Sequence, residues 1–573
     1  MNTLHAERII LIGPTGSGKT TVATEVARLL GWSLLDTDAL VERDAGMRIA
    51  EVFARDGEAA FRELEAAALA AALSAERVVI ATGAGIVERP AQLGAMRAAG
   101  WVVALDVSTR TALQRLLAAA PSDVAPGDLR PMLTGTDPLV RLRSLDARRR
   151  DAYAQADATC STEGVTAVEV ARQVVAGLAA HGLLPPDGAA AAITTIPSAA
   201  GAYTAVVAWG ALAALGEHLA RLSMPSRLHI VADASVAALY AAPLVARLSA
   251  AGFEPAVLTI PAGETSKSRT QWARICDWLA ERRAERGEAV VALGGGVTGD
   301  LAGFAAATYL RGVPLVHVPT SLLAQVDASI GGKVAIDHPR GKNLIGAFYP
   351  PRLVVTDPAA LLTLPARQRS EGWAEAIKHG VALDTDYFAA LEAGAAALSA
   401  LRPRETTAAI ARSVALKGAI AGGDEREFGP RLWLNYGHTI AHALETVSGY
   451  GEWLHGEAVA VGMGVAARMG LRLGITPVEL IERQDALLTR FGLPTRLPPV
   501  SAEALLHAAL WDKKVRGGRV RWVLPSALGH ATIADEVPDD VVRAALLEAG
   551  AVAEAPAEAG ERAHAAPDEE AGG

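Results

Sequence analysis

The chain has 573 residues, too many for one hydrophobic core, so we expect about three or four domains. Hydrophobic residues make up 51% of it, but much of this is dispersed alanine and valine, and no apolar run reaches the length of a membrane span. The formal net charge of −9 argues against general nucleic-acid binding. A strand-like segment begins at Arg8 and leaves no room for a signal peptide, and Cys160 and Cys276 fall in different predicted domains. We therefore expect a cytoplasmic protein without disulfides.

The first motif is a phosphate-binding loop. Residues 13–20, Gly-Pro-Thr-Gly-Ser-Gly-Lys-Thr, match GxxxxGK[ST] between a β-branched strand and an expected helix over 21–30. In such a loop, backbone N–H groups cradle phosphate oxygens, the lysine neutralises the β and γ phosphates, and the threonine hydroxyl reaches Mg²⁺. The residues predicted to hold the nucleotide are Gly13, Gly16, Gly18, Lys19, Thr20 and Thr21.

Further stretches make residues 1–176 resemble shikimate kinase; they are Leu35–Asp38, Phe61–Glu65, Thr82–Gly85, Arg130–Leu133 and Arg149. The resemblance implies a P-loop kinase domain, with a parallel sheet and helices on both faces. It also implies phosphoryl transfer from ATP, with Mg²⁺, to shikimate. Catalysis in such a site is mainly positioning and charge neutralisation.

The resemblance to shikimate kinase also implies roles for single residues. Asp36 would lie near the metal with Thr20, and Asp38 near the reacting hydroxyl. Arg130 would lie near the nucleotide phosphates, under a lid around residues 118–133. Two arginines would clamp the shikimate carboxylate, because a guanidinium fork matches a planar carboxylate. The acceptor-binding residues that it implies are Asp38, Arg62, Gly83, Gly85 and Arg149.

Two departures from the shikimate kinase pattern bear on kinase activity. Gly83-Ala84-Gly85 stands where the family usually has three glycines, and the usual proline after Arg149 is replaced. The methyl group of Ala84 is tolerable unless the backbone there needs a positive φ. The alternative to a working kinase is a nucleotide-dependent regulatory or docking module.

The next region contains a predicted linker and an α/β pattern. Residues 177–193 are predicted to be a tether, because prolines and a glycine precede an alanine run without amphipathic period. Strands are expected over 227–233, 255–260 and 288–293. Residues 294–300, Gly-Gly-Gly-Val-Thr-Gly-Asp, fit GxGxxG before an expected helix over 301–310. The acidic residue expected about 20 positions later is missing, so the motif alone does not establish a dinucleotide-binding site.

A dense group of charged and imidazole side chains lies in residues 371–457, within an apolar helical pattern. Such groups are costly to bury without partners, which indicates a site. One carboxylate with two imidazoles suits a divalent ion such as zinc. Spacing alone favours His438 and His442 as the metal pair, because residues i and i+4 share a helix face.

Three stretches resemble 3-dehydroquinate synthase: Glu371-Gly-Trp-Ala-Glu375-Ala-Ile-Lys378, Asn435-Tyr-Gly-His438-Thr-Ile-Ala-His442, and His455-Gly-Glu457. The resemblance implies another ligand set, Glu375, His438 and His455, with His442 in the substrate pocket. We follow it and keep His442 as the rival ligand. It also implies NAD⁺ and zinc, or cobalt in place of zinc, as cofactors. The implied fold has an α/β NAD-binding domain over 194–350 and a mostly helical metal and substrate domain over 351–550. A homodimer through this unit is one assembly that it allows.

The resemblance to 3-dehydroquinate synthase assigns the remaining site residues. Toward NAD⁺ it places Asp233, Glu264, Lys267, Gly294, Gly295, Gly296, Val297, Asp300, Thr320, Ser321, Lys342, Asn343 and Thr363. Toward the substrate it places Asp327, Lys333, Lys342, Asn343, Lys378, Lys417, Arg431, Asn435, His442 and one of Lys513 and Lys514. The residues expected to act in catalysis are Lys333, Lys378, Lys417, Arg431, Asn435 and His442, with Lys19, Asp38 and Arg130 in the kinase.

Together the two resemblances predict a bifunctional shikimate-pathway enzyme. One half would phosphorylate shikimate, and the other would cyclise 3-deoxy-D-arabino-heptulosonate 7-phosphate to 3-dehydroquinate. In the 3-dehydroquinate synthase family, NAD⁺ transiently oxidises a substrate hydroxyl, and phosphate is eliminated. The hydride then returns to the substrate, and an intramolecular aldol reaction closes the ring. The rival enzyme is another sugar phosphate cyclase, acting on a substrate without a carboxylate. No nucleic acid or membrane is expected as a partner, and residues 551–573 are expected to be disordered.

Overall fold

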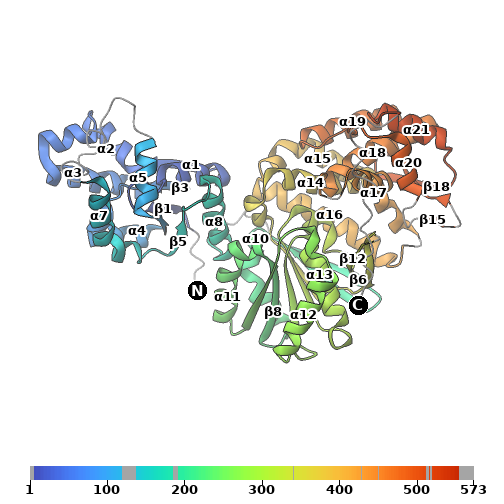
Figure 1. The fold of residues 1–573 in the computed structure, drawn as a ribbon, viewed down its shortest axis with the longest axis horizontal. Coiled ribbons are helices and arrows are strands. Elements are labelled where there is room, and N and C mark those ends of the chain that lie inside the picture. Colours follow the sequence, from blue (N-terminus) through green and yellow to red (C-terminus); the bar gives the residue numbers. More distant parts are fainter. Residues whose placement is uncertain are drawn as a thin grey trace, which may run out of the picture. The chain divides into compact units, whose positions relative to one another are not determined.

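The computed structural model describes residues 6–118, 137–184, 191–339, 341–427, 429–449, 451–510, 515–516 and 519–553. Of the predicted site residues, Arg130, Lys513 and Lys514 lie outside these ranges, as does the expected tail from residue 554 onward. The chain divides into two compact units, Met1–Pro186 and Asp187–Gly573 (Figure 1). Among the described helices, none is both long enough and apolar enough to cross a bilayer.

The first unit is built on a five-stranded parallel sheet with strand order β2–β3–β1–β4–β5. The strands are β1 (Arg8–Ile12), β2 (Ser33–Asp36), β3 (Val78–Ala81), β4 (Trp101–Asp106) and β5 (Ala158–Ser161). The helices are α1 (Lys19–Leu30), α2 (Thr37–Ala45), α3 (Ile49–Ser74), α4 (Pro90–Ala99), α5 (Thr109–Ala118), α7 (Pro138–Tyr153) and α8 (Ala167–Ala180). Residues 9–12 are all fully buried, as in a central strand covered on both faces. Strand β1 therefore carries the phosphate-binding loop to the carboxyl edge of the sheet.

The second unit begins with a seven-stranded sheet in the order β6–β7–β14–β11–β10–β8–β9. The strands are β6 (Ala192–Ser198), β7 (Gly201–Val207), β8 (Arg227–Asp233), β9 (Glu254–Ile260), β10 (Ala289–Gly294), β11 (Leu315–Pro319) and β14 (Leu353–Thr356). Its helices include α9 (Leu215–Arg221), α10 (Ala234–Val236), α11 (Ala242–Ala250), α12 (Arg269–Glu281) and α13 (Gly296–Thr308). Only the edge strand β6 runs antiparallel to its neighbour within this sheet. The chain leaves β8 in one direction and β10 in the other, so a crevice opens between their carboxyl ends.

A two-stranded ribbon and a helical region complete the second unit. The ribbon pairs β12 (Lys333–His338) with β13 (Gly341–Phe348). The helices are α14 (Ala366–Leu383), α15 (Thr385–Ser399), α16 (Pro403–Gly423), α17 (His438–Val447), α18 (His455–Arg472), α19 (Val478–Arg490), α20 (Ala502–Leu510) and α21 (Asp539–Glu548). Short hairpins pair β15 (Val515–Arg516) with β16 (Arg519–Val520), and β17 (Trp522–Ala527) with β18 (His530–Ala534). Helix α14 is buried almost continuously from residue 372 to 382, which makes it the centre of the helical core.

The predicted fold class is confirmed, while several boundaries differ. Helix α13 begins at Gly296 and not at 301, because the glycine-rich motif itself forms its first turn. Strand β14 extends the parallel sheet beyond the predicted domain boundary at 350. Helix α8 continues to Ala180, with Leu178 buried, and β6 pairs with β7 from Ala192. Ordered elements therefore reach into both ends of the stretch 177–193 that was predicted to be a linker.

Candidate active sites

The phosphate-binding loop joins β1 to α1 as the sequence predicted. Gly13, Gly16 and Gly18 have φ values of 146°, 83° and 86°, and a Cβ atom on Gly13 would lie 2.4 Å from the Leu105 carbonyl oxygen. These positions therefore require glycine. Lys19 Nζ donates to the carbonyl oxygens of Gly13 and Pro14 at 2.9 and 3.0 Å, so the ammonium group is folded over the loop.

The residues predicted to lie near Mg²⁺ meet beside the loop. The Thr20 hydroxyl, one residue into α1, donates to Asp36 Oδ2 at 2.7 Å. Asp36 ends β2 and caps α2, because its Oδ1 accepts from the backbone N–H of Asp38 at 2.9 Å. Hydroxyl and carboxylate oxygens are ligands that Mg²⁺ prefers. The structure thus brings Thr20 and Asp36 together, while Thr21 is exposed on the first turn of α1.

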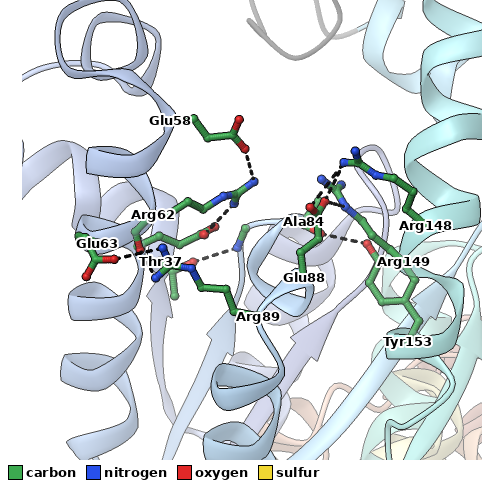
Figure 2. A network of polar contacts seen from close by, with 12 residues as sticks. Thr37, Glu58, Arg62, Glu63, Ala84, Glu88, Arg89, Arg148, Arg149 and Tyr153 are labelled. Carbon is green, nitrogen blue, oxygen red and sulfur yellow. Dashed lines mark hydrogen bonds and ion pairs between the residues drawn. The ribbon is translucent and has the colours of Figure 1, made fainter.

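The predicted acceptor residues gather around the Gly83–Gly85 turn at the end of β3 (Figure 2). A Cβ atom on Gly83 would lie 2.7 Å from Asp38 Oδ1, and one on Gly85 would lie 2.5 Å from Arg62 Nη1. The turn is held by a hydrogen bond from the Gly83 N–H to the Thr37 hydroxyl at 2.9 Å. The glycines therefore let a carboxylate and a guanidinium group approach the backbone closely.

Both predicted clamp arginines are buried and paired with carboxylates that the sequence analysis did not assign. Arg62 Nη1 contacts Glu65 Oε2 at 2.8 Å, and Arg149 Nε contacts Glu88 Oε1 at 2.6 Å. Burial raises the pKa of Glu65 more than Arg62 lowers it. The reverse holds for Glu88, whose pKa is lowered because its arginine neighbours outweigh burial. The acidic residues could have been suspected, because a buried guanidinium needs a counter-charge.

Ala84 fits the turn without strain. It is not among the non-glycine residues with positive φ, and its carbonyl oxygen accepts a hydrogen bond from the Tyr153 hydroxyl at 3.1 Å. We expect Ala84→Gly to change kcat/KM for a kinase reaction by less than about threefold, because the methyl group costs no backbone strain here. Steady-state kinetics with varied acceptor check this. A gain of about tenfold or more would show that the methyl group obstructs the acceptor.

The second unit has its glycine-rich loop in the crevice between β8 and β10. Gly294 ends β10, and a Cβ atom on it would lie 2.6 Å from the Thr298 hydroxyl and 3.1 Å from Asp233 Oδ2. A Cβ atom on Gly295 would lie 3.3 Å from the Ser321 hydroxyl. Only glycine leaves room there for a pyrophosphate to approach the N-terminus of α13. Val297 follows the loop in the first turn of α13, and Thr320 follows the neighbouring strand β11. The Thr320 N–H donates to the Gly294 carbonyl oxygen at 3.0 Å.

Other predicted NAD⁺ residues lie in a second group beside the loop. Lys267 Nζ pairs with Asp300 Oδ2 at 2.5 Å and donates to the Asn343 side-chain oxygen. Glu264 is the first residue of the short 3₁₀ helix that precedes Lys267. Burial lowers the pKa of the Lys267 ammonium group, but the charges of Asp300 and Glu264 outweigh it, and the pKa is raised. Thr363 is buried and hydrogen-bonded to the Tyr240 hydroxyl at 2.7 Å, which ties the short 3₁₀ helix Pro358–Thr363, ahead of α14, to the segment that follows β8.

A carboxylate and two imidazoles from three helices form one cluster. Glu375 is fully buried in α14, while His438 and His455 are the first residues of α17 and α18. His438 Nε2 and His455 Nε2 lie 3.4 and 3.7 Å from Glu375 Oε1. Neither Glu375 oxygen accepts a hydrogen bond of good geometry from the described residues, although Lys378 makes a close ion pair with Oε2. A buried carboxylate that faces two imidazole nitrogens fits a divalent cation.

The rival set around His442 fits a cation less well. His442, Glu445 and His455 also lie close enough to share an ion. Glu445, like Glu375, has a lysine partner, Lys342 Nζ at 3.4 Å, and it also lies 3.6 Å from His455 Nδ1. The Nδ1 atom of His438 lies 3.2 Å from the Tyr436 carbonyl oxygen, which directs its Nε2 toward Glu375. The geometry therefore favours Glu375, His438 and His455 over the pair predicted from spacing.

Glu445 extends the cluster outward from His455, and no sequence signal assigned it a role. Burial opposes its ionisation, but His455 and Lys342 lower its pKa to about 2. Carboxylates that contact the far nitrogen of a metal-bound histidine fix the ring orientation. Its spacing of three and seven residues from His442 and His438, on one helix face, was the signal that could have found it.

Substitution of Glu445 tests this role. We expect Glu445→Gln to weaken metal affinity by about tenfold or more while leaving the fold intact, because the His455 ring loses its charged partner. Competition with a chromophoric chelator measures the affinity directly. Glu479→Gln, on the exposed side of α19, is the matched control. Equal affinities in both variants would contradict the role.

The predicted substrate residues form a network that continues from the cluster. Asp327 Oδ1 lies 2.7 Å from Lys417 Nζ and 3.9 Å from Lys378 Nζ, and these lysines hold its pKa well below its usual range despite burial. Arg431 is 2% exposed and donates to the carbonyl oxygens of Glu425 and Gly331 at 2.9 and 3.2 Å. Its Nε also lies 3.6 Å from Glu427, which pairs with Lys333. Asn435 is the last residue of the 3₁₀ helix Pro430–Asn435, which also contains Arg431. Asn435 is half-buried, as is His442 on α17.

A loop of this kind at the head of a parallel sheet defines a P-loop phosphotransferase fold. A glycine-rich loop in the crevice of a parallel sheet, together with a carboxylate–imidazole cluster, is the site arrangement of a sugar phosphate cyclase. Family models agree with both classes. The model described as shikimate kinase matches residues 15–179, and those described as 3-dehydroquinate synthase N-terminal and C-terminal match residues 257–371 and 372–515.

Individual proteins and solved structures are similar to parts of this chain. The 3-dehydroquinate synthase of a Synechococcus species is 48% identical over 353 residues, covering 60% of this chain and 95% of the relative. The 2-epi-5-epi-valiolone synthase of Streptomyces hygroscopicus, solved with NAD⁺ and Zn²⁺, is 29% identical, covers 60% of this chain and 96% of its own, and has a TM-score of 0.57. A shikimate kinase of Acinetobacter baumannii, solved with shikimate, is 32% identical over 30% of this chain and 91% of its own, with a TM-score of 0.28. This chain belongs to the 3-dehydroquinate synthase family and carries a shikimate kinase domain ahead of that enzyme.

Proposed function

We propose that the chain catalyses two reactions of the shikimate pathway. The first unit transfers a phosphoryl group from ATP to shikimate, giving shikimate 3-phosphate. The second unit converts 3-deoxy-D-arabino-heptulosonate 7-phosphate to 3-dehydroquinate and releases phosphate. The observation that carries the second assignment is the buried Glu375 carboxylate, which faces two imidazoles and pairs with Lys378. The 48% identity to a 3-dehydroquinate synthase supports the choice of substrate.

Two groups of residues would hold the cofactors of the cyclase. Glu375, His438 and His455 would bind a divalent cation, zinc or cobalt, and the loop at 294–296 would bind NAD⁺. Bound there, the cation would supply a Lewis acid to the substrate hydroxyls, and NAD⁺ a temporary hydride acceptor. Since the hydride returns to the substrate, no net oxidation is expected.

The cationic side chains supply anion binding and orientation. Lys378 and Lys417 lie beside Asp327, and Arg431 lies within electrostatic reach of Lys417, which suits a substrate with a carboxylate and a phosphate. On the other side, Lys333 and Lys342 project from the ribbon β12–β13 and pair with internal glutamates. The anionic groups of the substrate would take the place of Glu427 and Glu445 as partners of Lys333 and Lys342. The ribbon would then close over a site in which the lysine charges are neutralised by the substrate. Arg431 already has protein partners, so its burial alone does not require a substrate anion.

In the first unit, the loop and Lys19 would bind ATP phosphates, and Thr20 and Asp36 would hold Mg²⁺. Asp38 lies beside Gly83, where it would face the acceptor hydroxyl. Arg62 and Arg149 would hold the acceptor carboxylate. Their positions on both sides of the turn support shikimate as the acceptor, because it carries a carboxylate and vicinal hydroxyls.

Phosphate release from two heptulose phosphates tests the cyclase substrate. The purified full-length chain, with NAD⁺ and Zn²⁺, receives the heptulosonate phosphate or a heptulose 7-phosphate without a carboxylate. We expect kcat/KM to favour the carboxylate substrate by on the order of 10²-fold or more, because a substrate without a carboxylate forgoes the charge-assisted hydrogen bonds that these cationic side chains would make to it. Preference for the other substrate would assign the chain to another class of sugar phosphate cyclase.

We also propose a cytoplasmic location, where ATP and NAD⁺ are available. Both cysteines are free, Cys160 buried and Cys276 half-buried, which suits a reducing compartment. A homodimer through the second unit stays a prediction, and size-exclusion chromatography with light scattering checks it.

A further inference from the structure

Glu88 connects the turn of the acceptor site to the arginines of α7. It is the last residue of a short 3₁₀ helix, Ile86–Glu88, and its N–H donates to the Gly85 carbonyl at 3.0 Å. Its Oε1 accepts from Arg149 Nε at 2.6 Å and from Arg148 Nη2 at 3.2 Å. Figure 2 shows Glu88 beside the turn, with both guanidinium groups reaching it from α7.

One nitrogen of the Arg149 guanidinium group lacks a hydrogen-bond partner in the described part of the chain. Its side chain is 3% exposed, and its buried Nη2 donates no hydrogen bond to any residue in the described part of the chain. A buried cation is costly unless it is paired. Glu88 supplies that pairing through Nε, which leaves the Nη2 side to meet an incoming carboxylate.

The second clamp arginine is held in a comparable way from the opposite side. Arg62 contacts Glu65 at 2.8 Å and Glu58 at 3.3 Å. Against the effect of burial, Arg149, Arg148 and Arg62 together lower the pKa of Glu88, so the two clamp arginines lie within electrostatic reach of one another's carboxylates. Figure 2 shows them on opposite sides of Ala84, with the guanidinium groups turned toward the space above the turn.

We propose that Glu88 is a positioning residue for the acceptor carboxylate: it holds Arg149 so that the unpaired edge of the guanidinium group faces the acceptor. The inference rests on the kinase function proposed above. Because Glu88 ends the short helix that follows the Gly83–Gly85 turn, it joins Arg149 to that turn. Within the described residues, Glu88 contacts Arg148, Arg149 and Gly85 and not the phosphate-binding loop, so its role concerns the acceptor and not the nucleotide.

Three variants of the full-length chain test this role: Glu88→Ala, Glu88→Gln and the control Glu63→Ala. Glu63 pairs with Arg89 at 3.1 Å on the exposed side of the same region. We expect Glu88→Ala to raise KM for shikimate by about tenfold or more, with KM for ATP and kcat within about twofold. Glu88→Gln should recover most of this loss, because its amide oxygen still accepts from Arg149 Nε. The control should behave as wild type, and the cyclase activity of each sample standardises its concentration.

Two results would overturn the inference in different ways. If the wild-type chain forms no ADP in response to shikimate, the proposed kinase function fails and the inference fails with it. If wild type is active but Glu88→Ala leaves KM for shikimate unchanged, the inference alone is wrong. A parallel rise of KM for ATP and shikimate in Glu88→Ala would show a general structural role and would also contradict positioning.

Discussion

Replacing His438 with alanine should abolish cyclisation and leave shikimate-dependent ATP turnover within about twofold of wild type. Loss of a Lewis-acid site removes several kcal/mol of transition-state stabilisation, so we expect cyclisation to fall by on the order of 10³-fold or more. The bound metal should fall in parallel, which elemental analysis of the purified chain measures without relying on activity. His530→Ala, at an exposed histidine of β18, is the control and should retain both.

The companion variant His442→Ala separates the two candidate ligand sets. Since Glu375, His438 and His455 form the favoured set, this variant should keep its metal while cyclisation falls through weaker substrate binding. If His442→Ala lost its metal and His438→Ala kept it, the ligand assignment would be wrong.

Replacing Lys19 with alanine should have the opposite pattern. The Lys19 ammonium group lies over the carbonyl oxygens of the loop, 2.9 Å from that of Gly13, where the β and γ phosphates are expected. Removing this charge should lower ATP turnover by on the order of 10³-fold, because phosphoryl transfer depends mainly on charge neutralisation and positioning. Cyclisation should be unchanged within about twofold, since each unit has its own site.

The control for Lys19→Ala is Arg28→Ala, at an exposed arginine of the same helix that pairs with Glu25. It should keep both activities. Loss of cyclisation in Lys19→Ala, or of kinase activity in His438→Ala, would refute the independence of the two sites.

The fold was predictable where local patterns are strong. The apolar run before the loop and the run over 227–233 became β1 and β8. The start of α13 was missed because glycines, which disfavour helices, form its first turn where the cofactor must approach. Strand β14 was missed because a run of four residues carries too little periodic signal.

The candidate sites were predictable only in part, for a physical reason. Spacing along one helix suggested His438 and His442, but the favoured ligands come from three helices separated by long stretches of chain. Local periodicity carries no information about which residues of different helices come together in the fold. The resemblance to 3-dehydroquinate synthase supplied that ligand set. The carboxylates Glu88 and Glu445 were missed for the same reason, since their partners are visible only after folding.

The central claim is that one chain carries two working enzymes, and ADP formation tests it most directly. The purified full-length chain is incubated with ATP and Mg²⁺, with and without shikimate, and ADP is measured beside phosphate release from the heptulosonate phosphate. We predict shikimate-dependent ADP formation that disappears in Lys19→Ala, together with intact phosphate release. Phosphate release without any shikimate-dependent ADP would contradict the claim and would make the first unit a nucleotide-binding module attached to a cyclase.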